Sequence, residues 1–259
     1  MTGIFQHEGF DLAYLDRPPV AGGDGDPILL IHGFGSSLQV NWVGPGWVKV
    51  LTEAGYRVVA FDNRGHGQSS KTYDPADYTP EKMAGDAAAL LDHLGIERAH
   101  VMGYSMGARI SAFLALAEPQ LVATLILGGL GIGMVEGVGE WDPIADALLA
   151  ADPATITHPR GKMFRAFADQ TKSDHRALAA CITTSRTLLT EDQVARITQP
   201  TLVAVGSDDD IGGSASALAG LMPNAESFEI EGRDHMLSVG DRTFKRRALE
   251  FLRDHPLRD

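Results

Sequence analysis

Short runs of apolar residues recur along the chain, and almost every position within each run is apolar. Five such runs cover residues 27–32, 57–62, 100–102, 123–127 and 201–205. A strand with one face in water alternates apolar and polar residues, whereas a nearly continuous apolar run is typical of a strand covered on both faces. Glycine-containing turns and amphipathic segments separate the runs. The pattern therefore predicts an α/β fold, a doubly wound, mostly parallel sheet with right-handed crossovers.

Other segments complete this predicted sheet. Residues 80–94 have helical periodicity, with Thr79 placed to cap the helix and Pro80 at its first position. Residues 227–231 predict a last strand. Residues 5–15 predict an extra antiparallel strand or hairpin at the sheet edge.

The alternation stops between residues 131 and 198, where we find no good strand candidate. Helical pieces occupy residues 144–151, 158–170, 174–189 and 191–197. We therefore expect residues 1–130 and 199–259 to form the core, and residues 131–198 to form a helical lid, with a lengthened crossover as the alternative. Most of its larger apolar side chains are expected to pack inside the lid, although they could instead line a pocket; they are Met134, Met163, Phe164 and Phe167.

The composition limits the possible partners. Twenty-two Lys and Arg against 34 Asp and Glu give a net charge of −12, which disfavours a nucleic-acid partner and favours a neutral substrate over a dicarboxylate unless a local patch reverses the field. The single cysteine, Cys181, excludes an internal disulfide. The N-terminus lacks a signal-peptide pattern, and the longest apolar-leaning run, residues 121–135, contains four glycines. We expect a cytoplasmic protein with no membrane partner; the oligomeric state is not indicated.

Chemically useful residues follow the predicted strands. In an open parallel sheet, ligands bind outside the carboxyl ends of the strands. The residues found there are His32-Gly33-Phe34-Gly35, the stretch 62–69 (DNRGHGQS), Ser105, Asp208-Asp209-Asp210 and His235. A serine, an aspartate and a histidine are thus expected at one edge of the sheet.

These three residue types suit nucleophilic catalysis. Ser105 lies in Gly-Tyr-Ser-Met-Gly between a strand and a helix, a sharp turn that exposes a nucleophile. A histidine can take the serine proton, and a carboxylate can orient that histidine. Of the nine histidines only four follow Ser105, and of these only His235 follows a predicted strand. Turn geometry favours Asp209 as the orienting acid, with Asp208 and Asp210 as alternatives.

The surrounding loops suggest further roles. The backbone N–H groups of Met106 and Phe34 are expected to form an oxyanion hole. Phe34, Tyr104 and Met106 are also expected to contact substrate. His32 and His66 are expected to make structural hydrogen bonds within their loops. Asp62 and Arg64 are expected to brace their loop, with a charge-assisted pair as one means.

The ordered set of oxyanion loop, nucleophile turn, Asp209 and His235 resembles the α/β-hydrolase superfamily, and residues 62–69 look like its DxRGxGxS loop. The resemblance implies an α/β-hydrolase fold with a helical lid insertion. Serine at the nucleophile position separates the chain from haloalkane dehalogenases and epoxide hydrolases, which carry aspartate there. The chain is similar to serine esterases, enol-lactone hydrolases and cofactor-free perhydrolases.

This resemblance implies hydrolysis of a small carboxylic ester or lactone through an acyl-enzyme on Ser105, without cofactor or metal. Two other functions stay open. One is a carbon–carbon bond hydrolase or lyase of the same fold, and the other is a ligand receptor that keeps the triad.

Overall fold

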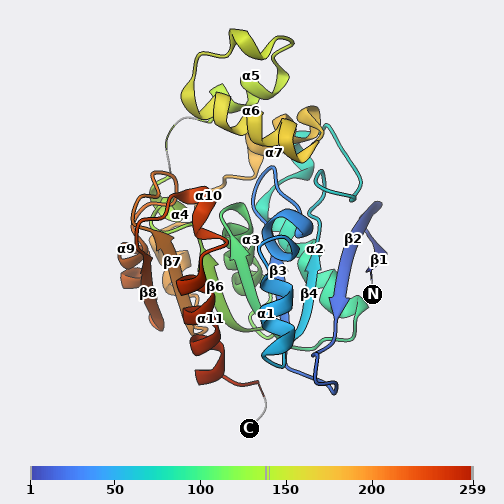
Figure 1. Ribbon diagram of the computed structural model, residues 1–259, viewed down its shortest axis with the longest axis vertical. Coiled ribbons are helices and arrows are strands. Elements are labelled where there is room, and N and C mark those ends of the chain that lie inside the picture. Colours follow the sequence, from blue (N-terminus) through green and yellow to red (C-terminus); the bar gives the residue numbers. More distant parts are fainter. Residues whose placement is uncertain (1, 138, 140, 258–259) are drawn as a thin grey trace.

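The protein, described by a computed structural model over residues 2–137, 139 and 141–257, is built around one eight-stranded sheet (Figure 1). The strand order is β1-β2-β4-β3-β5-β6-β7-β8, with antiparallel pairing for β1–β2 and β2–β4 and parallel pairing elsewhere. The strands are β1 Thr2–His7, β2 Phe10–Arg17, β3 Pro27–Ile31, β4 Arg57–Phe61, β5 Ala99–Tyr104, β6 Val122–Gly128, β7 Thr201–Gly206 and β8 Ala225–Ile230. The predicted parallel sheet and its edge hairpin are confirmed.

Helices cover both faces of this sheet. The helices of the described residues are α1 Trp47–Glu53, α2 Pro80–His93, α3 Met106–Ala117, α4 Gly133–Glu136, α5 Asp142–Leu149, α6 Pro159–Thr171, α7 His175–Thr184, α8 Glu191–Ala195, α9 Ala215–Leu221, α10 His235–Ser238 and α11 Arg242–Asp254. Short helical turns lie at Gln39–Val43, Pro75–Asp77 and Pro153–Thr155.

Two hydrophobic cores explain the continuous apolar runs. Side chains of β3 alternate between them: Ile28 and Leu30 pack in the core that includes α1 and α11, whereas Leu29 and Ile31 pack in the core that includes α2, α3 and α9. Because both faces of the central strands are covered, neither face of β3 can carry a polar residue without burying it.

Between β6 and β7 the described residues form helices and loops only, and α5, α6 and α7 lie together at one end of the molecule (Figure 1). The predicted helix over residues 174–189 ends earlier, because the chain leaves α7 at Ser185. The carbonyl of Thr187 is thereby free of the helix and accepts a hydrogen bond from Arg109.

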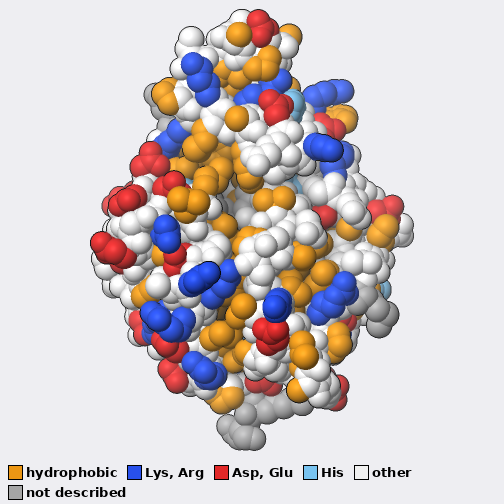
Figure 2. Space-filling view, viewed as in Figure 1, with side chains coloured by type: hydrophobic (Ala, Val, Ile, Leu, Met, Phe, Trp, Pro, Cys, Tyr) orange, Lys and Arg blue, Asp and Glu red, His pale blue; other side chains and the backbone are white. Residues whose placement is uncertain are grey.

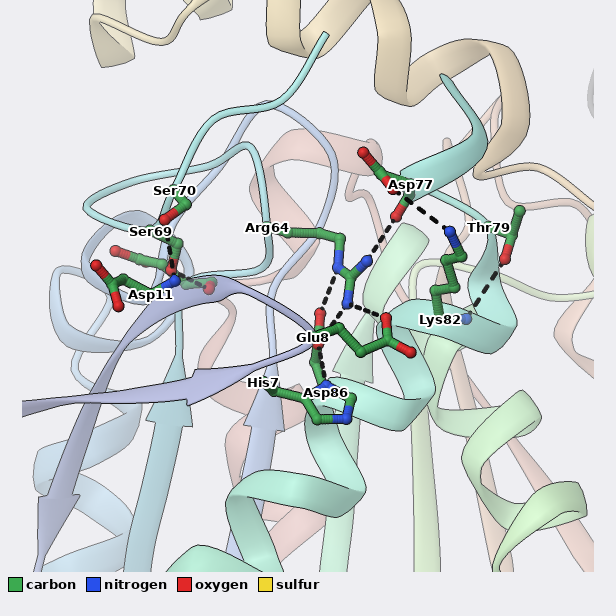
Figure 3. A network of polar contacts seen from close by, with 11 residues as sticks. His7, Glu8, Asp11, Arg64, Ser69, Ser70, Asp77, Thr79, Lys82 and Asp86 are labelled. Atoms are coloured by element: carbon green, nitrogen blue, oxygen red, sulfur yellow. Dashed lines mark hydrogen bonds and ion pairs between the residues drawn. The ribbon is translucent and has the colours of Figure 1, made fainter. Parts of the chain in front are cut away.

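A buried ion-pair network joins the edge hairpin to the core (Figure 3). The fully buried Arg64 donates two hydrogen bonds to Asp86 of α2, from Nε at 2.7 Å and from Nη2 at 2.6 Å. His7 approaches the same carboxylate at 2.7 Å, and Arg64 also reaches Glu8 at 3.2 Å. These contacts connect the loop after β4, the helix α2 and the β1–β2 turn.

The charged partner of Arg64 is therefore Asp86, and a pair between Arg64 and Asp62 does not form. Asp62 instead accepts hydrogen bonds from the N–H groups of Leu38 and Gln68, at 2.7 and 2.8 Å. Both residues brace the loop, as the sequence predicted, but each does so with a different partner.

We expect Asp86→Ala to lower the free energy of unfolding by roughly 3–5 kcal/mol, because it leaves the buried Arg64 charge without its main partner. Glu53→Gln removes an exposed carboxylate, 3.9 Å from Lys49 in the same helix, and should change stability by less than about 0.5 kcal/mol. Urea unfolding of both variants measures the difference. Equal midpoints would contradict the assigned role of Asp86.

Candidate active site

The turn that carries Ser105 has a strained backbone. Ser105 lies between β5 and α3 with φ 55° and ψ −112°, a conformation unusual for a residue with a side chain. An added Cβ at Gly107 would stand 1.9 Å from the carbonyl oxygen of Ile31, and one at Gly103 would stand 2.1 Å from that of Gly107. Both flanking positions therefore require glycine, because α3 begins directly against the backbone of β3.

Three loops bring Ser105, His235 and Asp209 together. The Ser105 Oγ lies 3.0 Å from His235 Nε2, and His235 Nδ1 lies 2.8 Å from Asp209 Oδ2. If Nδ1 carries its proton toward the carboxylate, Nε2 presents a lone pair to the serine hydroxyl. The arrangement can move a proton from Ser105 to His235.

The structure selects Asp209 over its two neighbours as the partner of His235. The other oxygen of Asp209 accepts hydrogen bonds of 2.8 Å from the N–H groups of Ile211 and Gly212. Burial acts to raise the pKa of Asp209, but His235 and these N–H groups outweigh it and lower the pKa below its usual value. Asp208 contacts Ser207, and the exposed Asp210 faces Arg160.

The predicted oxyanion donors belong to two segments that adjoin Ser105. Met106 begins α3, and Phe34 belongs to the loop after β3. This loop is held against the serine, since the Gly33 N–H donates to Asn41 at 2.8 Å and an added Cβ at Gly33 would stand 3.4 Å from the Ser105 Cβ. Within the described residues, neither the Phe34 nor the Met106 N–H has a hydrogen-bond partner.

A largely apolar cavity of about 570 Å³ opens beside Ser105 and His235. Figure 2 shows hydrophobic side chains gathered below the helices at the upper end of the molecule. Met163, Phe164 and Phe167 line the cavity, whereas Met134 is buried elsewhere in the core. The expectation that most of these four side chains pack only inside the helical segment is therefore wrong, because α6 turns one side toward the sheet.

The predicted contact residue Tyr104 has a second task. Its ring lines the cavity, but its hydroxyl is buried and donates a 2.5 Å hydrogen bond to the carbonyl of His235. Tyr104 thus holds the loop that carries the histidine.

Arg109 is a residue of this site that the sequence analysis missed. It lies one helical turn after Ser105 on α3, so both side chains project from the same side of the helix. Its guanidinium donates to the carbonyls of Gly133, Met134 and Thr187, at 2.9 to 3.2 Å. The i,i+4 spacing from the serine was the available signal.

Three buried histidines outside this group are held neutral. His32 donates from Nδ1 to the Gly33 carbonyl and accepts the Asn63 N–H at Nε2, so both ring nitrogens are occupied in the uncharged form. Burial lowers the pKa of His32 to about 4, that of His66 to about 3 and that of His100 to about 4. His66 donates to the Arg64 carbonyl within its loop. The predicted structural role of His32 and His66 agrees with these contacts.

Among the residues that the structure describes, no cluster of three or more His, Cys, Asp or Glu side chains is suited to hold a metal ion. None of the helices within these residues combines the length and apolar character needed to cross a membrane.

The profile of a family described as the alpha/beta hydrolase fold matches residues 26–157. The chain belongs to this family. Over 251 residues it is 31% identical to the dihydrolipoyllysine-residue acetyltransferase component of an acetoin cleaving system from Pseudomonas putida. That alignment covers 91% of this α/β hydrolase but only 66% of the relative, so the chain corresponds to part of that protein.

Two solved structures of similar fold cover almost the whole chain. A hydrolase from Pseudomonas aeruginosa PA01 has 26% identity and a TM-score of 0.78, covering 96% of this chain and 97% of its own. The enol-lactonase from Burkholderia xenovorans LB400 has 23% identity and a TM-score of 0.73, covering 97% and 100%. At this identity the second likeness concerns the fold alone.

We expect Gly107→Ala to destabilise the protein by about 3 kcal/mol or more, because the new methyl group meets backbone that cannot move independently. Gly220→Ala is the matched control, since its Cβ would meet nothing within 4 Å and alanine favours the helix α9. Thermal or urea unfolding compares the two. A stable, fully active Gly107→Ala variant would contradict the packing described for the turn.

We also expect the free energy of unfolding to fall as the pH drops from about 6.5 to about 4. The unfolded chain binds protons on His32, His66 and His100 near pH 6.5, whereas the folded chain binds them only near pH 4 or below. Acid therefore favours unfolding. Each histidine should contribute about 1.4 kcal/mol per pH unit in this window. Urea unfolding at pH 7, 6 and 5 measures the slope, and His100→Gln should make it shallower. Equal stability at pH 7 and pH 5 would contradict the assignment.

Proposed function

We propose that this α/β hydrolase cleaves a small carboxylic ester or lactone through an acyl-enzyme on Ser105. The observation that supports it most is the hydrogen-bonded chain from Ser105 through His235 to Asp209, beside a cavity with mainly apolar walls. An apolar cavity with a few convergent polar groups suits a small organic substrate.

In the proposed reaction Ser105 attacks the substrate carbonyl while His235 takes the hydroxyl proton at Nε2. Asp209 stabilises the imidazolium, and the N–H groups of Phe34 and Met106 stabilise the tetrahedral oxyanion. His235 then gives its proton to the leaving alcohol oxygen as the carbon–oxygen bond breaks. A water molecule, deprotonated by His235, finally hydrolyses the acyl-enzyme.

We further propose that residues 131–198 act as a lid. Phe164 of α6 lines the cavity and packs edge-to-face on Phe34, with ring centroids 5.6 Å apart. The helical segment thereby contacts the loop that carries an oxyanion donor, and it excludes water from the reacting carbonyl.

Ser105→Ala should lower kcat/KM for short p-nitrophenyl esters by roughly 10⁵- to 10⁶-fold, and Asp209→Asn by about 10⁴-fold, because the amide fails to orient and stabilise the histidine. Asp208→Asn is the matched control: its exposed side chain lies one residue away, and its activity should stay within about twofold.

Initial rates on acetyl, butyryl and octanoyl esters test these variants. Ester turnover that survives in Ser105→Ala would refute the proposal. A different outcome is a wild type that shows no ester turnover above background while its Ser105 still reacts with a fluorophosphonate. That outcome would refute the ester assignment and point to carbon–carbon cleavage or to a receptor.

A further inference from the structure

A second, much smaller cavity of about 40 Å³ adjoins Ser105 on its Met106 side. We call it the chamber; it is lined by Phe34, Ser105, Met106, Arg109, Leu130, Trp141, Phe164, Ile182, Ser185, Arg186 and Ile211. His235 lines the large cavity and not the chamber, whereas Met106 lines the chamber and not the large cavity.

This division orients the substrate of the proposed reaction. The leaving alcohol must lie beside His235, which protonates it, and it therefore occupies the large cavity. The acyl group extends from the opposite side of the carbonyl carbon and points into the chamber. A cavity that holds one water molecule needs roughly 10–15 Å³, and the chamber offers about 40 Å³. The chamber therefore accepts a short acyl group of a few atoms.

Among the residues that the structure describes, the chamber walls carry two positive charges and no negative one. Within this part of the chain neither Arg109 nor Arg186 forms an ion pair with an acidic side chain, and no Asp or Glu lines the chamber. Arg186 donates from Nε to the Ile182 carbonyl at 2.8 Å and lies over the Trp141 ring at 5.2 Å. Its two terminal nitrogens have no hydrogen-bond acceptor within the described part of the chain.

The two guanidinium groups also affect each other. Burial, followed by the charge of Arg186, lowers the pKa of Arg109 to about 10. Burial lowers the pKa of Arg186 as well, and Asp142 opposes this from beyond ion-pair distance. Two partly buried cations repel each other. An anion bound beside both of them offsets this repulsion and favours their charged forms.

A third polar group, Ser185, lies on the same wall. It is only 2% exposed, and its hydroxyl has no hydrogen-bond partner of normal geometry. Its polar neighbour is the thiol of Cys181, which is only weakly polar. A buried hydroxyl without a partner costs free energy, and an acceptor in the chamber would remove that cost.

We propose that the chamber binds a carboxylate carried by the acyl group, which makes half-esters of short dicarboxylic acids, or lactones bearing a carboxylate, the preferred substrates. This inference rests on the proposed function. Arg186 pairs with the carboxylate through its terminal nitrogens, and Ser185 donates a hydrogen bond to it. Arg109 adds positive charge while its hydrogen bonds to carbonyls hold the wall in place. The local charge thus reverses the preference for neutral substrates that the net charge suggested.

An outer cavity also borders both arginines, but it is a poorer place for an anion. Glu136 lines that cavity, and its carboxylate repels a second one. A carboxylate bound in the chamber lies next to Ser105 and shields the serine from a labelling reagent, whereas a carboxylate bound in the outer cavity does not.

The first test compares monoethyl succinate with ethyl levulinate, a neutral ester of nearly the same shape. We expect the wild type to prefer the anionic ester in kcat/KM, and Arg186→Gln to reduce that preference roughly 10- to 100-fold. Arg186→Lys should restore part of it. Arg176→Gln removes a charge from α7 outside both cavities and should leave the preference unchanged.

The second test needs no turnover. Succinate should slow the labelling of Ser105 by a neutral fluorophosphonate in the wild type, and should slow it at least tenfold less effectively in Arg186→Gln. Ethyl levulinate at the same concentration measures protection that is independent of charge.

The two tests separate the two proposals. Ser105-dependent hydrolysis of both esters without an anionic preference, or with one that Arg186→Gln leaves intact, overturns the carboxylate site and keeps the esterase. Arg186-dependent protection by succinate without hydrolysis of either ester supports the carboxylate site and overturns the esterase. Absence of both protection and hydrolysis overturns both.

Discussion

The contact between the start of α3 and the backbone of β3 is the constraint on which the site depends. A serine with φ 55° is held there only because the surrounding hydrogen bonds and packing leave no alternative. The Ser105 N–H donates to the Gly128 carbonyl of β6, and the Ser105 carbonyl accepts from Ala108 and Arg109. Gly107 fits under the carbonyl of Ile31. Ser105, Met106 and Arg109 therefore all belong to the turn and the helix that start at this contact, so the packing of α3 on β3 fixes their relative positions.

The buried Arg64 differs from the two arginines of the chamber in its partners. Arg64 is matched by the carboxylate of Asp86 at 2.6 and 2.7 Å, so its charge is compensated within the fold and its task is to join the hairpin to α2. Arg109 and Arg186 meet carbonyl oxygens and an aromatic ring instead. Carbonyls satisfy N–H groups but carry no net charge, so no ion pair with a described acidic side chain compensates the positive charge of these two arginines.

The sequence was informative where local rules determine structure. Continuous apolar runs identified the strands that are buried on both faces. The Gly-Tyr-Ser-Met-Gly turn requires its glycines because neighbouring backbone lies directly against them. The sequence favoured Asp209 among three consecutive aspartates but left Asp208 and Asp210 open, because the choice depends on which carboxylate the turn directs at His235. The pairing of Arg64 with Asp86 was also beyond reach, since these residues are 22 positions apart and meet only through the packing of α2. For the same reason the sequence could not show which side of α6 faces the cavity.

The family profile covers only part of the segments that line the two cavities beside Ser105. The family profile ends at residue 157, so it includes Phe34, Ser105 and Arg109 but excludes α6 and α7 and the residues that follow them. Those excluded segments supply Phe164 and Phe167 to the large cavity and Ser185 and Arg186 to the chamber. Proteins of this fold can therefore share the turn that carries Ser105 and still differ in substrate, because the helices inserted after β6 supply part of the walls around that serine. Arg109 joins the two parts, since it belongs to the helix that follows Ser105 and its hydrogen bonds hold the inserted segment at Gly133, Met134 and Thr187. The inserted segment is thus tied by hydrogen bonds to α3, the helix that begins at the Ser105 turn.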